Sequence, residues 1–362
     1  MASGGRPLGA RLLPARGSGR DRWLPAARPG ATRMRPTIFS RLKNRLASEV
    51  VALHSILKHG IPDKIVSYPG GIGDTLLCTV PIEALAKANP QMRIWVITHY
   101  PEIFNNNPSV YAALRPCNVA FAHASFLEGR VLDLAYTQAR RPGLEMEEDV
   151  PPVKHILEIM CARAGVACPR ELKPRFYLSG EDKPGLPLPG EYVVVQSIGP
   201  EAGSAMRNKL WPAERYQEVV DQLHKAMPRI EVVQLGGPKE TPLKNVLDLR
   251  GRNTIRETGE ILAKAQLYIG GVGFLMHMAR AVECPAVIIY GGREHAWQSG
   301  YPCNENIETH LPCSPCWKWN RCDIDRECMK MITVEMVLQA VQRLRNRLGQ
   351  PLEVETYAVK QG

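Results

Sequence analysis

The sequence predicts an α/β protein made of two doubly wound domains that face each other across a cleft. Short runs rich in β-branched residues alternate with helix-forming segments along most of the chain, a pattern that indicates parallel strands joined by crossover helices. The alternation stops in the Pro- and Gly-rich stretch 179–190 and then begins again. A chain of 362 residues also exceeds the length at which one hydrophobic core usually suffices.

The first half predicts three strands and two helices. Strands are expected at 64–68, 93–98 and 131–136, where apolar residues follow one another. A glycine loop after the first strand should open a helix that reaches about Ala88, and a further helix is expected at 153–164. Each helix would return the chain to the next parallel strand.

The second half repeats this rhythm after the linker 179–190. The expected strands lie at 192–196, 230–235, 267–269 and 286–290. Helices should begin at Pro212, a residue tolerated in a first turn, and at Thr254, which forms a capping box with Glu257. Two more helices are expected near 277–282 and at 334–348. The last of these is expected to pack back across the linker.

The net charge of +10 is concentrated at the N-terminus. Residues 1–46 hold eleven Lys and Arg and one Asp, and the remaining chain has 35 basic and 35 acidic residues. Because the folded part is neutral, nucleic-acid binding is not expected. The segment is rich in Arg, Pro, Gly and Ala and has no apolar core, so we interpret it as a disordered leader. A mitochondrial transit peptide and a translation start at Met34 are the alternatives.

An amphipathic helix is expected at 41–59. Apolar residues recur there at steps of three and four, namely Leu42, Leu46, Val50, Leu53 and Leu57. The helix either packs on the first domain or lies on the inner membrane as a peripheral contact. No stretch reaches eighteen consecutive apolar residues, so no membrane span is expected. The scattered cysteines outside 313–328 fit a reducing cytoplasm.

Ligands of open parallel sheets bind where strands end and helices begin, and the first such loop is 69–75. Its glycines Gly70, Gly71 and Gly73 allow a sharp turn and a close backbone approach. Asp74 is the only ionisable residue in this loop. It is a candidate catalytic carboxylate, with a simple helix N-cap as the alternative.

Three loops of the second half are candidates for a nucleoside diphosphate site. The first runs from Ser197 to Lys209, where backbone N–H groups and the lysine would share phosphate charge; a solvated cation is the alternative for Lys209. The second loop holds Gly236, Gly237 and Glu240, whose carboxylate would accept two ribose hydroxyls. The third holds Gly271, Gly273 and His277. His277 is a ligand or a structural helix residue.

Four cysteines lie within sixteen residues, at Cys313, Cys316, Cys322 and Cys328. A pair two residues apart can reach one ion from a single turn, and two further thiolates complete a tetrahedral sulfur set. The segment therefore predicts iron, zinc or an iron–sulfur cluster. Two disulfides, or cysteines that simply fill apolar gaps, are the alternatives.

In combination, the loops resemble glycosyltransferase family 9, the ADP-heptose:lipopolysaccharide heptosyltransferases. The likeness covers roughly residues 62–345. It is carried by the segments 71–81, 209–212, 236–240, 248–254, 270–277 and 290–292.

This resemblance implies a GT-B fold and inverting sugar transfer without a divalent metal. The implied domains are the leader 1–46, an acceptor domain 47–180, a nucleotide-sugar domain 181–333 with the cysteine segment, and a helix and tail 334–362. The family's general base falls on Asp74. The donor would be ADP-heptose or similar, bound by Ser197, Lys209 and the second-half glycine loops.

Two departures from the family pattern leave the substrate open. The family's aspartate before the histidine is missing from the stretch 271–274, so another activated sugar is an alternative to heptose. The cysteine segment resembles that of iron-binding protein heptosyltransferases, so a protein acceptor is an alternative to a lipopolysaccharide core or other surface saccharide. A non-catalytic metal-binding protein that keeps the two-domain shell is the alternative from another class.

Overall fold

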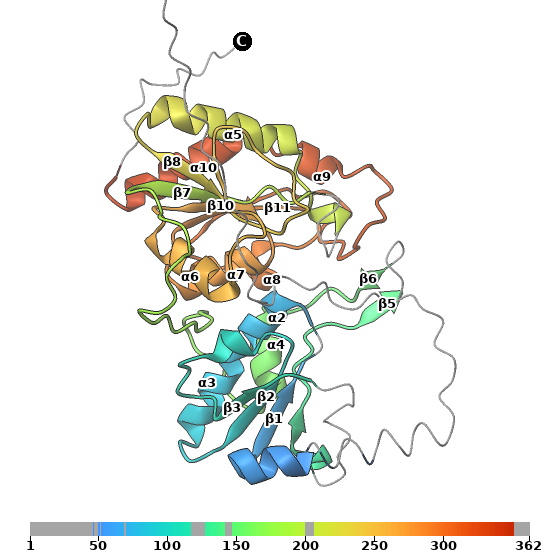
Figure 1. The fold of residues 1–362 in the computed structure, drawn as a ribbon. Coiled ribbons are helices and arrows are strands. Elements are labelled where there is room, and N and C mark those ends of the chain that lie inside the picture. Colours follow the sequence, from blue (N-terminus) through green and yellow to red (C-terminus); the bar gives the residue numbers. More distant parts are fainter. Residues whose placement is uncertain are drawn as a thin grey trace, which may run out of the picture.

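The computed structural model describes residues 46, 50, 52–68, 70–116, 127–141, 147–199 and 206–350. These residues form two parallel sheets, one in each half of the chain, with helices packed on them (Figure 1). The expectations for the leader up to residue 45 and for the tail beyond residue 350 lie outside the described residues. None of the described helices is long and apolar enough to cross a membrane.

The N-terminal sheet has the order β3-β2-β1-β4, and all its pairings are parallel. Its strands are β1 (Lys64–Ser67), β2 (Ile94–Ile97), β3 (Ala112–Leu114) and β4 (Val131–Leu132). The helices α2 (Ile72–Leu77), α3 (Thr79–Ala88) and α4 (Ile156–Arg163) and the short 3-10 turns η1 (Pro101–Phe104) and η3 (Glu128–Arg130) accompany it. Successive strand residues point to opposite faces, so Val66 and Val96 pack with α3 and α4 while Ile65 and Trp95 face the other side.

The C-terminal sheet has six parallel strands in the order β12-β11-β10-β7-β8-β9. They are β7 (Tyr192–Val195), β8 (Glu231–Gln234), β9 (Leu247–Asp248), β10 (Tyr268–Gly271), β11 (Ala286–Gly291) and β12 (Glu305–Glu308). The central strands β7, β10 and β11 are buried at every residue because both faces of the sheet are covered. The helices are α5 (Ala213–Ala226), α6 (Ile255–Lys264), α7 (Phe274–Ala281), α8 (Ala296–Ser299), α9 (Glu327–Lys330) and α10 (Val334–Arg347), and η4 (Arg207–Lys209) precedes α5.

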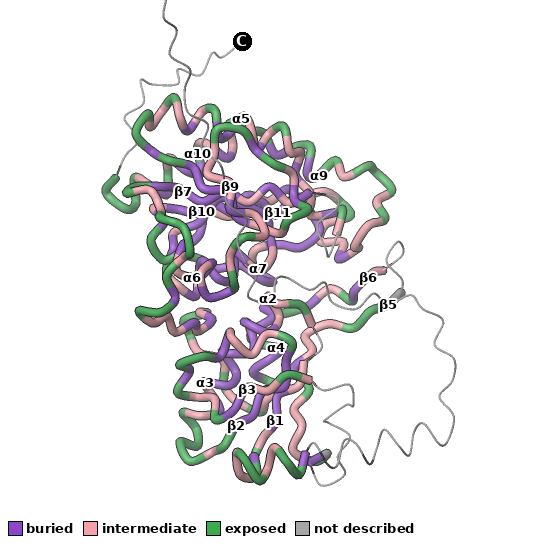
Figure 2. Tube along the Cα trace, in the orientation of Figure 1, coloured by how far each residue is buried: buried purple, intermediate pink, exposed green. Residues whose placement is uncertain are grey.

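The two faces of this sheet have different partners. Val193 and Val195 lie in one buried cluster with residues of α5 and α10, while Tyr192 and Val194 lie in another with residues of α6 and α7. The second cluster continues through α2 and α3 into the N-terminal sheet, and buried residues accordingly run from one sheet to the other in Figure 2. The face of α6 and α7 is therefore the one turned toward the N-terminal domain (Figure 1).

Three expected elements differ from the observed ones. The first helix divides at Cys78 into α2 and α3. The strand expected at 131–136 pairs only over Val131–Leu132, and residues 133–138 continue without a sheet partner among the described residues. The last helix, α10, packs on α5, β11 and β12 rather than across the linker.

Residues 52–59 are helical and cover the outer face of the N-terminal sheet, but not through the expected leucines. Ala52 and Ile56 are the residues that pack against the sheet. The expected apolar stripe is exposed instead, at 58% for Leu46, 67% for Val50, 55% for Leu53 and 78% for Leu57, and Leu42 lies outside the described residues. The helix thus packs on the domain and also presents an apolar stripe outward.

Candidate functional site

The carboxylate of Asp74 is fixed by two hydrogen bonds at the start of α2. The backbone N–H of Gly71 donates to its Oδ2 at 2.7 Å, and the hydroxyl of Tyr136 donates to its Oδ1 at 2.8 Å. Gly70 has no side chain to obstruct this arrangement, since a Cβ there would lie 2.6 Å from Oδ2 of Asp74 and from Tyr68. Asp74 accepts a hydrogen bond from Gly71, the N-cap residue of α2, and so does help to cap this helix. The hydrogen bond from Tyr136 gives its carboxylate a second partner that is distant in sequence.

Burial raises the pKa of Asp74 above its ordinary value. The hydrogen bonds from Tyr136 and Gly71 and the charge of Lys209 oppose this shift, while Glu294 adds to it. A carboxylate with a raised pKa accepts a proton more readily, as a general base requires. Lys209 and Glu294 belong to the other domain, so the charge on Asp74 is influenced from both sheets.

The start of α2 packs against the start of α7, where the two domains meet. Gly73 is the residue in contact, because a Cβ built on it would lie 3.5 Å from Cα of Phe274 and from Cδ2 of His277. His277 is buried and its Nδ1 is hydrogen-bonded to the Tyr301 hydroxyl at 2.7 Å. Burial lowers the pKa of His277 to about 3, so its ring is neutral. The ring packs where α7 meets α2.

Lys209 is not a solvated cation. Its Nζ lies 2.6 Å from Oε1 of Glu294, and its side chain is 17% exposed. Burial lowers the pKa of Lys209, and the charge of Glu294 opposes that shift. Burial alone would raise the pKa of Glu294, but Lys209 and Arg293 together lower it to about 2. Glu294 is therefore ionised and keeps Lys209 charged.

The ion pair continues into a buried network that joins the two halves of the chain. Arg293 Nη1 lies 2.9 Å from Oε1 of Glu294, and its Nη2 lies 3.0 Å from Oδ2 of Asp149. Asp149 belongs to β6 (Glu148–Asp149), which pairs with β5 (Ala139–Arg141). Trp319 donates from Nε1 to the same Asp149 oxygen at 2.9 Å. Sequence reasoning missed four residues of this network and of the Asp74 site, namely Tyr136, Asp149, Arg293 and Glu294. Two of them, Arg293 and Glu294, lie two and three residues after the end of β11.

Glu240 occupies a confined site at the end of β8. Gln196 donates to its Oε1 at 2.8 Å, whereas Oε2 is buried and has no partner among the described residues. Burial raises the pKa of Glu240 to about 7. Gly236 has φ +138° and a Cβ there would lie 2.0 Å from Oε2 of Glu240, so the position requires glycine. For Gly237 no atom lies within 4 Å of such a Cβ.

The remaining predicted donor residues lie at the same edge of the C-terminal sheet. Ser197 is buried, and its hydroxyl donates to the carbonyl of Thr241 at 2.6 Å, so it holds the loop of Glu240 in place. A Cβ on Gly271 would lie 3.8 Å from the backbone oxygen of Lys209. Gly273 is the N-cap of α7 and has no side-chain cap. Residues 200–205 of the first donor loop lie outside the described residues.

The cysteine segment is joined to the N-terminal half through its two tryptophans. The main-chain N–H of Asp149 donates to the main-chain carbonyl of Trp317 at 3.0 Å. The main-chain N–H of Trp319 donates to the carbonyl of Glu147 at 2.9 Å. Trp317 is buried, with the Arg293 guanidinium 4.8 Å above its ring. The two tryptophans thus contact Arg293 and Asp149.

Main-chain N–H groups point at three of the four cysteine sulfurs. Arg326 N–H donates to Sγ of Cys322 at 3.1 Å. Burial raises the pKa of Cys316 and of Cys328, and backbone hydrogen bonds at each sulfur oppose that shift. Donors of this kind favour the thiolate form that binds metals.

The four thiols nevertheless do not form a closed metal site. All four, including the exposed Cys313, are free cysteines rather than disulfides. No three of their sulfurs, among the described residues, lie all within 4.8 Å of one another. The donor chemistry therefore fits a metal ion, but the sulfurs are not gathered around one point.

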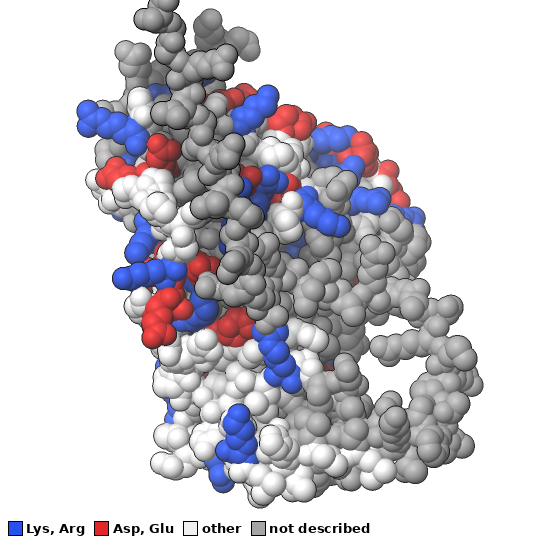
Figure 3. Space-filling model, in the orientation of Figure 1, with Lys and Arg blue, Asp and Glu red and all other residues white. Residues whose placement is uncertain are grey.

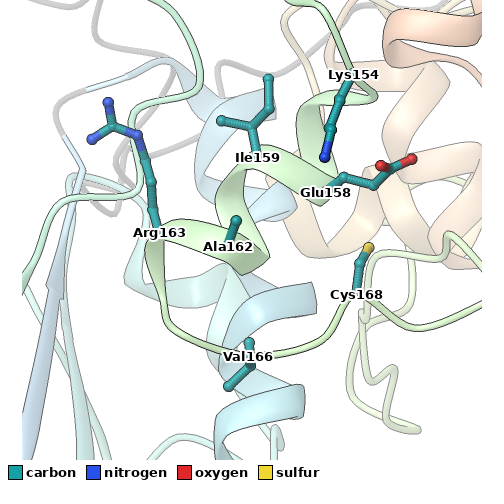
Figure 4. A pocket seen from close by; sticks show the side chains of 7 residues that line it. All are labelled: Lys154, Glu158, Ile159, Ala162, Arg163, Val166 and Cys168. Atoms are coloured by element: carbon teal, nitrogen blue, oxygen red, sulfur yellow. The ribbon is translucent and has the colours of Figure 1, made fainter.

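Two cavities lie away from the predicted site residues. One of about 480 Å³ is lined by α4, by Lys154 before it and by the loop after it, with Glu158 and Cys168 among the lining residues (Figure 4). In that view Arg163 extends away from Lys154 and Glu158. The other, of about 560 Å³, lies between residues 105–106 and 179–182. Neither is lined by a residue of the loops at 70–74, 197–209, 236–240 or 271–277.

The sequence model of "Glycosyltransferase family 9 (heptosyltransferase)" matches residues 189–322. Lipopolysaccharide heptosyltransferase 3 of Escherichia coli is 31% identical over 116 residues, which cover 29% of this chain and 32% of that protein. The match thus spans about a third of that curated relative. It supports the family resemblance without extending to the relative's whole length.

Three solved structures share the fold over both domains. A glycosyltransferase family 9 protein from Veillonella parvula has a TM-score of 0.56 at 16% identity, covering 78% of this chain and 97% of that one. E. coli heptosyltransferase II has a TM-score of 0.57 at 17% identity, covering 79% and 99%. The iron-containing heptosyltransferase TibC of enterotoxigenic E. coli, bound to ADP-D-beta-D-heptose, has a TM-score of 0.58 at 18% identity, covering 80% and 78%. Residues 189–322 are therefore similar to glycosyltransferase family 9, and the chain has the GT-B fold of two facing Rossmann-like domains that these solved structures share.

Proposed function

We propose that this protein is an inverting glycosyltransferase that moves a sugar from an ADP-heptose-like donor onto an acceptor hydroxyl. The observation that carries the proposal is the position of Asp74. Its hydrogen-bonded carboxylate lies where α2 meets α7, within the electrostatic influence of Lys209 from the opposite domain. A base on one domain and a partly buried cation on the other are what transfer between two bound substrates requires.

In the proposed reaction, Asp74 takes the proton of the acceptor hydroxyl. The freed oxygen forms a bond to the anomeric carbon on the face opposite the diphosphate, and the bond from that carbon to the diphosphate oxygen breaks. Lys209 stabilises the charge that develops on the departing diphosphate, together with backbone N–H groups near Gly271 and Gly273. Glu294 serves this step indirectly by keeping the buried Lys209 protonated. No divalent metal is needed for the transfer.

Glu240 is the proposed recognition group for the nucleoside. Its Oε2 is buried without a partner among the described residues, and a buried acceptor of this kind gains most from a ligand hydroxyl. Adenosine is the proposed nucleoside because ADP-heptose is the molecule bound to TibC. The domain division follows, with residues 47–180 binding the acceptor and 181–333 binding the donor.

A lipopolysaccharide core or another surface saccharide is the proposed acceptor, in line with the name of the E. coli relative. The second candidate is a protein acceptor, which the iron-containing TibC favours, with one iron or zinc held by Cys313, Cys316, Cys322 and Cys328. When bound, such an ion would fix the tryptophan contacts with β6. The nine free cysteines that the structure describes support a cytoplasmic location.

The test is transfer from labelled ADP-heptose by the wild type and by Asp74→Asn. Loss of the base should reduce kcat by about 10²–10⁴-fold, while donor-induced thermal stabilisation persists because the donor loops are unchanged. Asp221→Asn, on the exposed surface of α5, is the matched control. Equal turnover by the wild type and Asp74→Asn would show that Asp74 is not the base. A wild type without transfer activity would favour the alternative of a non-catalytic metal-binding protein with the same two-domain fold.

A further inference from the structure

Three residues outside the proposed transfer site bring metal-binding atoms together at the edge of the C-terminal sheet. His295 precedes α8, Glu308 ends β12, and His310 follows it two residues later. One ligand atom from each lies within 4.8 Å of the other two. The rings of His295 and His310 meet edge to face, with centroids 4.6 Å apart.

His295 has a polar atom that the protein itself does not satisfy. The residue is 6% exposed, and its Nε2 is buried with no hydrogen-bond partner among the described residues. A metal-binding histidine characteristically uses one ring nitrogen for a backbone or carboxylate partner and the other for the ion. Nε2 is thus the nitrogen left for a ligand.

Glu308 can serve the helix and an ion together. Its Oε2 accepts a hydrogen bond from the N–H of Ala296 at 2.7 Å, at the start of α8. Its Oε1 lies 3.4 Å from Nε2 of His310. Two ligands that each lie 2.0–2.2 Å from a tetrahedral zinc are about 3.4 Å apart. The spacing of the carboxylate and the imidazole therefore already suits one ion between them.

We propose that His295, Glu308 and His310 bind a divalent transition ion, with zinc as the best match. Two imidazoles and one carboxylate are a ligand set that zinc accepts, and three protein ligands leave one position for water. His310 is exposed, so an ion can enter from solvent. The site is separate from the thiols, because it uses nitrogen and oxygen ligands only.

The ion would connect three parts of the C-terminal domain. It would hold the end of β12 to the start of α8, and it would fix His310, which lies three residues before Cys313. α8 also contacts the N-terminal domain, since the His155 ring donates to the carbonyl of Gly300 at 3.0 Å. Binding should accordingly stabilise the folded chain, as any ligand specific for the native state does.

The experiment is a zinc titration of the full chain against a chromophoric chelator, followed by thermal unfolding with and without zinc. His310→Gln removes an exposed ligand without disturbing the core. Glu308→Gln keeps an oxygen for the Ala296 N–H but removes the charge. His54→Gln, an exposed histidine on the first helix, is the matched control. Cobalt absorption of the wild type and of Cys316→Ser separates this site from the thiols, since nitrogen and oxygen ligands give no sulfur-to-cobalt charge transfer.

We expect one zinc equivalent that Cys316→Ser retains. His310→Gln and Glu308→Gln should bind it at least about 10–100-fold more weakly, the loss that removal of an outer-shell partner already causes, with the thermal stabilisation lost in parallel. His54→Gln should bind like the wild type. Equal zinc affinity in His310→Gln and His54→Gln would overturn the proposal. So would a cobalt spectrum in which every bound equivalent shows sulfur ligation.

Discussion

Tyr136 sets the basicity of the proposed base through one hydrogen bond. Its hydroxyl donates to Asp74 and lowers the pKa of that carboxyl, against burial, which raises it. Tyr136→Phe should therefore raise the pKa of Asp74 further. A hydrogen bond to a charged group contributes about 1.5–3 kcal/mol, and Tyr136→Phe removes this stabilisation of the ionised form.

The measurement is the pH dependence of kcat/KM for sugar transfer. Because the base must be ionised, activity falls as the pH drops through the pKa of Asp74. The acidic limb of the profile should therefore move to higher pH in Tyr136→Phe. Tyr111→Phe, at a tyrosine 56% exposed, is the matched control. A uniform loss of activity with an unmoved limb would mean that Tyr136 only supports the fold.

Glu240 makes stability depend on pH in a direction opposite to that of most carboxylates. Burial raises its pKa from 4.5 to about 7. Between these values the folded protein binds more protons than the unfolded chain, so the free energy of unfolding falls as the pH rises through this window and levels off above it. The contribution of the buried carboxyl is roughly 3 kcal/mol.

Urea unfolding at pH values on either side of this window measures the effect. Glu240→Gln should be less sensitive than the wild type to a rise in pH between the two values, because the amide has no proton to lose. Glu231→Gln, an exposed residue at the start of β8, should retain the wild-type dependence. Parallel wild-type and Glu240→Gln profiles would show that Glu240 titrates normally.

At the scale of elements, strong local signals predicted the structure well. The capping box of Thr254 and Glu257 begins α6 as expected, with both of its hydrogen bonds present. The buried strands β7, β8 and β11 lie within one residue of their expected bounds. These segments have local sequence patterns that agree with their tertiary environment, and such elements can be found from sequence alone.

The strand expected at 131–136 fails for a reason that concerns the site. β4 pairs with β1 only at Val131 and Leu132. Beyond Leu132 the chain leaves the sheet, and this departure brings Tyr136 to Asp74, 62 residues earlier. Apolar alternation cannot reveal this, because it indicates which residues are buried but not which strand stops pairing.

The candidate site residues likewise divide into those that local sequence marks and those that only the tertiary structure brings together. Asp74, Lys209 and Glu240 follow strand ends and carry charge, so they could be selected from the sequence. Their partners could not, since Arg293 reaches Asp149 across 144 residues of sequence. Only the fold brings such residues together. The Tyr290-Gly-Gly292 run did mark the strand end that precedes Arg293 and Glu294.

At the scale of the whole molecule, two connections hold the domains together beside Asp74. α2 packs on α7, and Glu148 of β6 forms an antiparallel bridge with Lys318 of the cysteine segment. A change at the cysteines can therefore reach Asp149, Arg293 and Glu294 through Trp317 and Trp319. We therefore expect the cysteine segment to have a structural role at the contact between the two domains.

The outer surface of the N-terminal domain combines an apolar stripe with an exposed lysine. Leu53 and Leu57 are 55% and 78% exposed on a helix whose other face packs on the sheet, and Lys58 is exposed beside them. On the face drawn in Figure 3, acidic and basic side chains are intermixed over the described part of the C-terminal domain. We therefore expect this helix to be a surface that can contact an anionic membrane.

We predict that the full chain binds anionic vesicles through this helix. Burying one leucine contributes about 1.5–3 kcal/mol, so Leu53→Gln with Leu57→Gln should weaken partitioning at least about tenfold, as measured by vesicle sedimentation. Added salt should weaken it further, because charge attraction acts together with apolar burial. Val153→Gln with Leu186→Gln, which alters exposed apolar residues outside the stripe, should bind like the wild type. If both double variants partition equally, the stripe faces another partner, and contact with the membrane cannot be what brings a lipid-linked acceptor to Asp74.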